Sequence, residues 1–129
     1  MDTLEILKLF SDCSRLRILH LLYQKDLCVC ELVYLLGLNQ SNVSKHLNNM
    51  IQLGAVENYK VNKYTFYKLH KNILSEFPFV VDIINSLTVP NTTSSELNKL
   101  FIRDLNKLNT YAESSLTHED ICSNPIINI

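Results

Sequence analysis

Residues 27–54 read LCVCELVYLLGLNQSNVSKHLNNMIQLG and contain two short stretches with helical periodicity. Apolar residues recur at i, i+3, i+4 and i+7 across residues 29–36, and at i, i+4, i+7 and i+8 across residues 43–51. Between them, residues 37–40 combine Gly37, a typical helix stop, with polar residues that favour a new helix start. This pattern predicts a helix-turn-helix.

The second predicted helix leaves hydrogen-bonding side chains exposed on the face opposite its apolar stripe. In a major groove, Gln and Asn suit the edge of adenine, and Ser and Lys suit phosphate or guanine. An ordinary solvated face is the alternative for this helix taken by itself. The predicted base and phosphate contacts are Gln40, Ser41, Asn42, Ser44, Lys45 and His46.

A β-hairpin is predicted directly after these helices. Residues 55–61 and 64–69 are rich in Tyr, Val, Thr and Phe, and Asn62 and Lys63 form the turn between them. A helix-turn-helix followed by a hairpin is a winged helix-turn-helix, so we expect a mainly α fold with a small β-hairpin. On this wing Lys60, Lys63 and Tyr64 are predicted to contact the DNA backbone.

The chain has 129 residues, which is enough for one domain. Its charged residues are distributed unevenly along the sequence. The formal net charge is −1, yet residues 1–71 carry nine Lys or Arg against six Asp or Glu. Five lysines and a single glutamate lie within residues 40–71, which predicts a basic face suited to DNA. The alternative is that these lysines simply form the solvated surface of the hairpin and bind no DNA.

Several classes of protein are not expected from this composition. The first ten residues lack the positive start of a signal peptide, and no apolar run is long enough for a membrane span, so we expect a cytoplasmic protein without a membrane partner. We find no Gly-rich phosphate loop, nucleophile motif or carboxylate pair, so neither an enzyme nor an organic cofactor is expected. Four cysteines in a reducing compartment favour ligands, sensors or core residues over disulfides.

The segment LCVCEL places two cysteines at a predicted helix start. If Val29 is the first helical residue, Cys28 is the cap and Glu31 can bond back to free amides. A helix N-terminus favours thiolate, so we expect lowered thiol pKa values and affinity for soft ions such as As(III), Sb(III), Cd(II), Pb(II) or Zn(II). Helical residues two apart point about 200° from each other, so an ion held by Cys28 and Cys30 should unwind this turn. Simple core packing of the cysteines is the alternative.

Together these motifs resemble the ArsR/SmtB family of small metal-sensing repressors. The resemblance covers about residues 11–87 through SRLRILHLL, LCVCEL, LGLNQSNVSKHLNNMIQLGAVE and FYKL. It implies a homodimer that binds a pseudo-palindromic operator in double-stranded DNA, with a thiol site in the LCVCEL box. Where some arsenic-sensing relatives have a third Cys, this chain has Val33, which leaves Cys13 or Cys122 as the possible third ligand. The zinc site of other relatives is not expected, because Asp82 lacks its neighbouring His.

Residues beyond this resemblance are interpreted by pattern. We expect a winged helix and dimerisation domain over 1–88 that ends in one helix over 73–87, a linker over 89–95, an additional helix over 96–113 and a flexible tail over 114–129. The apolar stripe predicted for the additional helix comprises Leu97, Phe101, Leu105 and Leu108.

The sequence as a whole predicts a transcriptional repressor that leaves its operator when As(III) or Sb(III) binds Cys28 and Cys30. One alternative keeps the DNA binding and makes the thiols a sensor of oxidants or reactive sulfur species. A second alternative is a protein-interaction module that senses no metal and uses its C-terminal helix.

Overall fold

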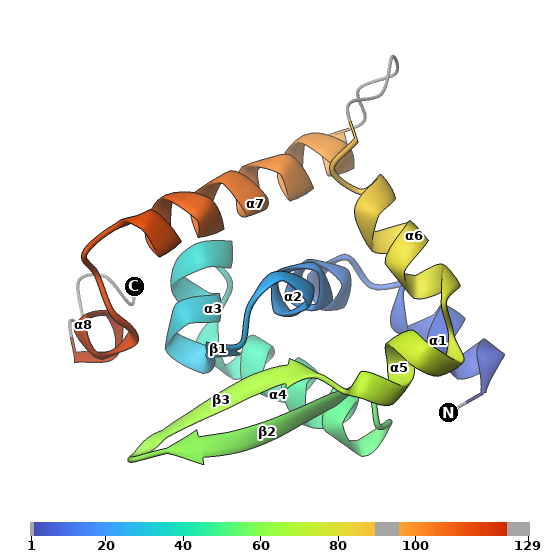
Figure 1. Ribbon diagram of the computed structural model, residues 1–129, viewed down its shortest axis with the longest axis horizontal. Helices are drawn as coiled ribbons and strands as arrows, with labels where there is room; N and C mark the ends of the chain where they lie inside the picture. Colours follow the sequence, from blue (N-terminus) through green and yellow to red (C-terminus); the bar gives the residue numbers. More distant parts are fainter. Residues whose placement is uncertain (1, 90–95, 124–129) are drawn as a thin grey trace.

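The computed structural model describes residues 2–89 and 96–123 of the chain. The two ends of the described chain lie at opposite sides of the molecule (Figure 1). In chain order the elements are α1 (Thr3–Leu9), α2 (Cys13–Gln24), β1 (Leu27–Cys28), α3 (Val29–Leu36), α4 (Gln40–Gln52), β2 (Val56–Val61), β3 (Tyr64–Leu69), α5 (Lys71–Glu76), α6 (Phe79–Ser86), α7 (Glu96–Glu113) and α8 (His118–Ser123).

Helices α3 and α4 form the predicted helix-turn-helix. Gly37 ends α3 in the left-handed region with φ of 66°, and its amide donates to the carbonyl of Val33 at 2.9 Å. Asn39 then caps α4, because its side-chain oxygen accepts from the amide of Ser41 at 2.8 Å. The stop and start signals read from the sequence therefore act as predicted.

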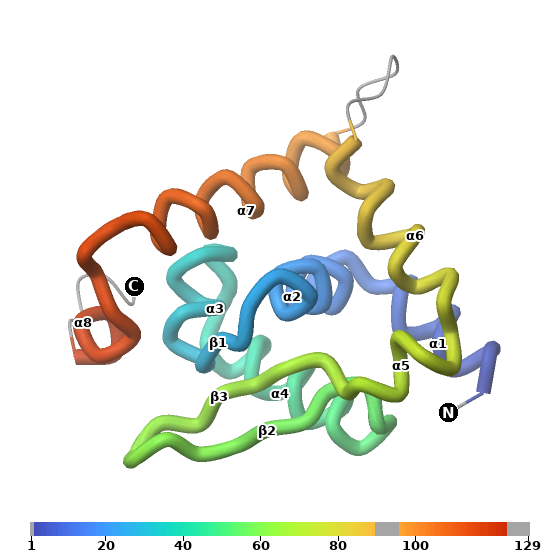
Figure 2. Tube along the Cα trace, in the orientation of Figure 1, coloured from blue at the N-terminus to red at the C-terminus, as the bar shows by residue number. Residues whose placement is uncertain are grey.

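The wing is a three-stranded antiparallel sheet in the order β1-β3-β2. Its hairpin, β2 and β3, has the predicted turn, where Asn62 adopts a φ of 57°. The sequence did not predict β1, which pairs Cys28 with Phe66 on β3. The backbone of the cysteine box is thus paired with the wing. The paths of β1 and β3 can be followed in Figure 2.

The prediction of one helix over residues 73–87 is wrong. The chain forms α5 and α6 with a break at Phe77, whose φ of −130° and ψ of 73° are not helical. Pro78 is the cause, since a proline disfavours helical geometry in the residue before it. Pro78 therefore precedes α6, whereas a single helix over 73–87 would contain it.

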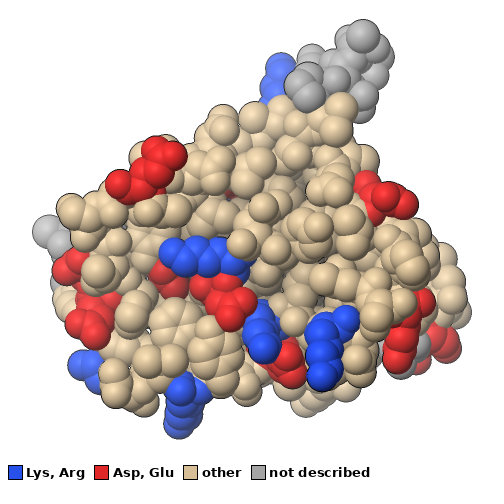
Figure 3. Space-filling model, viewed as in Figure 1, with Lys and Arg blue, Asp and Glu red and all other residues tan. Residues whose placement is uncertain are grey.

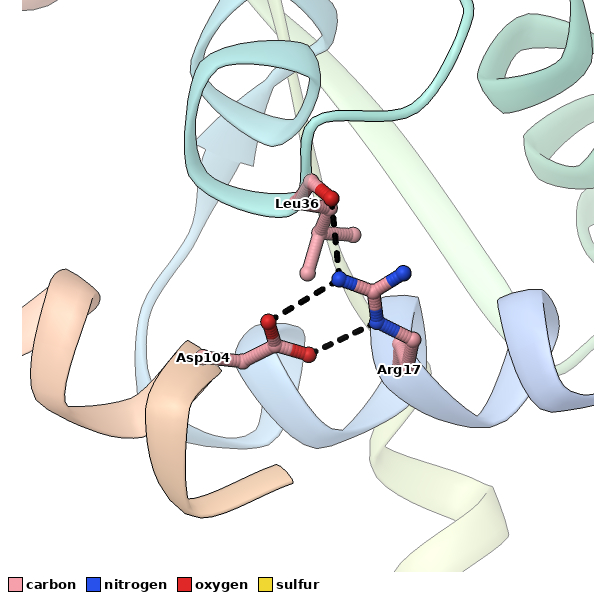
Figure 4. A network of polar contacts seen from close by, with 3 residues as sticks. All are labelled: Arg17, Leu36 and Asp104. Carbon is pink, nitrogen blue, oxygen red and sulfur yellow. Dashed lines mark hydrogen bonds and ion pairs between the residues drawn. The ribbon is translucent and has the colours of Figure 1, made fainter. Parts of the chain in front are cut away.

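Helix α7 lies across α2 and α3 on the side away from the hairpin (Figure 1). Its buried face differs from the predicted stripe, because Leu97 is 54% exposed while Asp104 and Tyr111 are buried. Asp104 is tolerated there because both of its oxygens accept from Arg17, at 2.8 and 3.0 Å. Arg17 also donates to the carbonyl of Leu36 at 2.8 Å, so one guanidinium joins α2, α7 and the end of α3 (Figure 4).

Part of the predicted flexible tail is folded. Helix α8 packs on α3, and its Ile121 is fully buried in the core. Most of the predicted linker, residues 90–95, and the end of the tail, residues 124–129, lie outside the described residues. Among the described residues, no helix is long and apolar enough to cross a membrane.

Candidate functional site

Helix α4 carries the predicted base-reading side chains around its first two turns. Val43, Leu47 and Met50 are completely buried on one face and fix the rotation of the helix. The polar residues divide into two groups. Gln40, Ser41, Asn42 and Lys45 are exposed, whereas Ser44 and His46 are half-buried.

His46 lies closer to the body of the protein than the sequence suggests. It contributes to a lowered pKa of Asp12, the cap of α2, although the amide of Arg15 is the larger cause. Of the predicted contact residues on α4, the four exposed ones are therefore the most accessible to DNA, and His46 faces the start of α2.

The wing carries its cations at the hairpin end. Lys60 and Lys63 are exposed, and the Lys63 ammonium lies 5.4 Å from the centre of the Tyr64 ring. Lys68 is partly neutralised by Glu57 at 3.5 Å. In Figure 3 basic side chains protrude along the lower edge, where β2 and β3 lie, with carboxylates interspersed. The basic character of this face is therefore concentrated near the turn.

Three of the four cysteines gather where β1 meets α3, and we call Cys28, Cys30 and Cys122 the thiol cluster. Cys28 is buried and is the cap of α3, as predicted, with its amide donating to Glu31 at 3.0 Å. The sulfur atoms of Cys28 and Cys122 are 3.8 Å apart. Cys30 is half-buried. Burial, and after it a hydrogen bond with the Cys30 thiol, raises the pKa of Cys122.

Cys13 lies elsewhere, as the exposed first residue of α2. It faces a cavity of about 290 Å³ that is also lined by Leu16, Leu87 and Phe101. Cys13 is at the start of α2 and the cysteine box follows its end, so the length of this 12-residue helix, about 18 Å at 1.5 Å per residue, separates them along the chain. Of the two proposed third ligands, only Cys122 is beside the box within one protomer.

Two expectations for the box are corrected. Burial raises the pKa of Cys28 to about 11, whereas we had expected the helix N-terminus to lower it. The argument for an unwound turn also fails for Cys28, because its backbone is extended, with φ of −89° and ψ of 171°. The 200° divergence of helical residues two apart therefore does not separate its thiol from that of Cys30.

The box is braced by residues that the sequence analysis did not single out. The hydroxyl of Tyr111 on α7 donates to the buried carboxylate of Glu31, whose other oxygen accepts from Cys28. One helical turn further along α3, the ammonium of Lys107 donates to the carbonyl of Tyr34 at 2.9 Å. The one sequence signal on α7, a charged Asp104 three residues after Phe101, belongs to a different contact of this helix, the ion pair with Arg17.

No group of three or more Cys, His, Asp or Glu within residues 2–89 and 96–123 is already arranged to hold a metal ion. The thiol cluster nevertheless has suitable donors. Metal–sulfur bonds of about 2.3 Å in a tetrahedral site place two sulfur ligands about 3.8 Å apart. The distance between Cys28 and Cys122 matches this spacing.

Known proteins with similar sequences are regulators. The family described as "Bacterial regulatory protein, arsR family" matches residues 12–58. An arsenical resistance operon repressor from Staphylococcus aureus is 35% identical over 89 residues, covering 69% of this chain and 80% of that protein. The cadmium resistance transcriptional regulatory protein CadC from Listeria innocua is 37% identical over 67 residues, covering 51% of this chain and 56% of its own length.

A solved structure has the same fold. HlyU from Vibrio cholerae superposes with a TM-score of 0.54 at 28% sequence identity, covering 64% of this chain and 97% of HlyU. The cysteine box, the helix-turn-helix and the start of the wing all lie in the family match. The chain therefore belongs to the ArsR family of bacterial regulatory proteins.

Proposed function

We propose that this protein is a DNA-binding transcriptional repressor that leaves its operator when As(III) or Sb(III) binds Cys28 and Cys30. The observation that carries the proposal is the place of the box in the fold. Cys28 caps α3, the first helix of the helix-turn-helix, and pairs through its backbone with Phe66 on the wing. A ligand bound here would therefore act on the helix-turn-helix through α3 and on the wing through β1.

In this proposal residues 1–88 bind DNA and dimerise, and the helix over 96–113 braces them. Leu4 and Leu7 on α1 are 60% and 52% exposed, and Leu97 on α7 is 54% exposed, which supports a partner surface. Two copies related by a two-fold axis would place their α4 helices in successive major grooves of a pseudo-palindromic operator. The proposed DNA contacts are Gln40, Ser41, Asn42, Ser44, Lys45, His46, Lys60, Lys63 and Tyr64.

Two observations support the proposed class of inducer: the thiol ligands of the site and the regulators that resemble this chain. Thiols select soft ions, and the relatives named above regulate arsenical and cadmium resistance. As(III) and Sb(III) are our first choice, since neutral arsenous acid condenses with thiols and needs no anionic site. Cd(II), Pb(II) and Zn(II) are the competing inducers.

The switch would act through the cap of α3. Glu31 is held by the Cys28 amide on one side and by the Tyr111 hydroxyl on the other. A ligand that pulls on the Cys28 and Cys30 sulfurs changes this cap, and α3 transmits the shift through Gly37 to α4. Ligand and DNA then oppose each other reciprocally, with an allosteric coupling of about 1 to 3 kcal/mol.

Fluorescence anisotropy of the reduced protein on DNA from upstream of its own gene tests the proposal. We expect arsenite or antimonite to weaken binding roughly 5- to 150-fold, which corresponds to that coupling. Cys28→Ser and Cys30→Ser should abolish the response, and Cys13→Ser should keep it. Unchanged affinity under saturating arsenite, antimonite, cadmium, lead and zinc would refute metal sensing, and the absence of any salt-dependent DNA binding would favour the protein-interaction module.

A second candidate is a thiol redox switch, which the 3.8 Å contact between Cys28 and Cys122 favours. Hydrogen peroxide would take two hydrogens from the two thiols, forming one S–S bond and two waters. Burial that raises the pKa of Cys28 opposes this route, because oxidants react with thiolate. DNA release on oxidation, with a Cys28–Cys122 bond in mass spectra that dithiothreitol reverses, would favour it over metal sensing.

A further inference from the structure

We infer that Cys122 completes, within one protomer, a three-thiol As(III) site with Cys28 and Cys30, so that α8 is part of the sensor. This inference rests on the proposed function and adds the third ligand and the element that supplies it. It makes the C-terminal helix, which lies beyond the family match of residues 12–58, a necessary part of ligand recognition.

The first support is the position of the Cys122 sulfur. It lies 3.8 Å from the sulfur of Cys28. A hydrogen bond with the Cys30 thiol also contributes to the raised pKa of Cys122. Cys122 is therefore in contact with the Cys28 thiol, at the end of β1, and close to the Cys30 thiol, in the first turn of α3. Three sulfur donors from three different elements, β1, α3 and α8, therefore lie near one another.

The second support is that α8 is anchored there by its own contacts. Ile121, next to Cys122, is completely buried in the core. The start of α8 is capped reciprocally, since Thr117 donates its amide to Asp120 at 2.8 Å and its hydroxyl oxygen accepts from the Asp120 amide at 3.3 Å. The position of Cys122 is thus set by a folded and packed helix.

Helix α8 also contacts the wing. The ring of His118 packs edge-on against Tyr64 and Phe66, with ring centres 4.8 and 4.9 Å apart. Phe66 is the residue that pairs with Cys28 across β1 and β3. A shift of α8 toward a bound ligand would therefore reach the wing through His118 as well as through β1.

The chemistry needs no oxidant or reductant. Arsenous acid, As(OH)3, exchanges its three As–O bonds for three As–S bonds, and each thiol proton leaves with a hydroxide as water. Arsenic stays trivalent, and the product is a neutral three-sulfur pyramid. Because the described residues hold no preassembled set of three ligands, the sulfurs must draw together on binding, and α8 is the element that closes on α3.

The test compares Cys122→Ser with the matched control Cys13→Ser in the full-length reduced protein. Arsenic X-ray absorption counts sulfur neighbours, and we expect three in the wild type and in Cys13→Ser. In Cys122→Ser we expect two sulfurs and one oxygen, at least a tenfold weaker arsenite affinity, and loss of operator release. Dibromobimane, which fluoresces only when it bridges two nearby thiols, should link Cys122 to the box within a single chain on a denaturing gel.

The outcomes separate this inference from the proposed function. A wild type that responds to arsenite, with an unchanged response and three sulfurs in Cys122→Ser, overturns the inference and leaves the function intact. Loss of one sulfur in Cys13→Ser, or a bimane bridge between two chains, assigns the third ligand to another site and also overturns it. If the wild type binds DNA but no arsenite, the proposed inducer fails and the inference fails with it.

Discussion

Gly37 sets the turn between α3 and α4 through its backbone alone. Its φ is 66°, and a Cβ atom added at this position would meet no other part of the protein within 4 Å. Any cost of a substitution therefore arises from the left-handed conformation, which L residues with a Cβ adopt at a cost of about 1–2 kcal/mol. Asn is the exception among common residues, because it tolerates this region.

We predict that Gly37→Ala lowers the free energy of unfolding by about 1–2 kcal/mol, and that Gly37→Asn costs less than Gly37→Ala. Urea denaturation followed by circular dichroism measures both. Equal stability of the alanine variant and the wild type would show that the turn does not need the left-handed conformation.

Asp104 is the buried acid of the network in Figure 4. Its side chain is 1% exposed and that of Arg17 is 8% exposed, so neither charge has water to replace its partner. Removing one member of a buried ion pair leaves the other uncompensated, at a cost of about 3–5 kcal/mol.

We therefore predict that Asp104→Ala destabilises the protein by about 3–5 kcal/mol, and that the double variant Arg17→Met with Asp104→Leu recovers most of this loss. Glu96→Gln, which removes the exposed ion pair with Lys99, is the control and should change little. Chemical denaturation measures the free energy of unfolding of each variant. A loss in the double variant as large as that in Asp104→Ala would mean that packing, not charge, is responsible.

At the scale of secondary-structure elements, α8 closes the thiol cluster and is attached through few residues. Ile121 is its buried anchor, whereas Leu116, just before the helix, is 38% exposed. Weakening the anchor should let α8 detach locally while the rest of the domain stays folded, because short terminal elements open at low free energy.

We predict that Ile121→Ala speeds the alkylation of Cys28 by at least about tenfold. Truncations of a buried Ile to Ala cost about 2–5 kcal/mol, and each 1.4 kcal/mol of lost docking energy raises the population of the state with α8 detached about tenfold. Peptide mass spectrometry after iodoacetamide treatment gives the rate at each cysteine. Leu116→Ala should leave the rate unchanged. An unaltered rate in Ile121→Ala would show that α8 does not shield Cys28.

For the whole molecule, DNA affinity should depend on a few lysines of the wing. The net charge is −1, so long-range attraction to DNA must come from local cations. Lys60 and Lys63 are exposed near the turn, whereas Lys68 is engaged with Glu57 and Lys99 with Glu96.

We predict that Lys63→Ala reduces the slope of log affinity against log salt concentration by about 1 per protomer, and that Lys60→Ala does the same. Lys99→Ala on α7 is the control and should leave the slope unchanged. Anisotropy titrations at several salt concentrations measure the slopes, and an unchanged slope in both wing variants would exclude these phosphate contacts.

Local signals in the sequence were sufficient for much of the fold. The glycine stop, the asparagine cap and the apolar stripes define α3 and α4, and the turn at Asn62 defines the hairpin. Each of these signals acts between residues a few positions apart, so no tertiary contact is needed to read them. The same holds for Cys28 as the cap of α3, which the spacing to Glu31 indicated.

Only the tertiary structure decided the partners of residues that are distant in sequence. Strand β1 has two residues and exists only because β3 pairs with it. Cys28 meets Cys122 across 94 positions, and Arg17 meets Asp104 across 87. The raised Cys28 pKa has the same origin: the helix start that the sequence showed favours thiolate, but burial by the folded chain, which the sequence could not show, is the stronger effect.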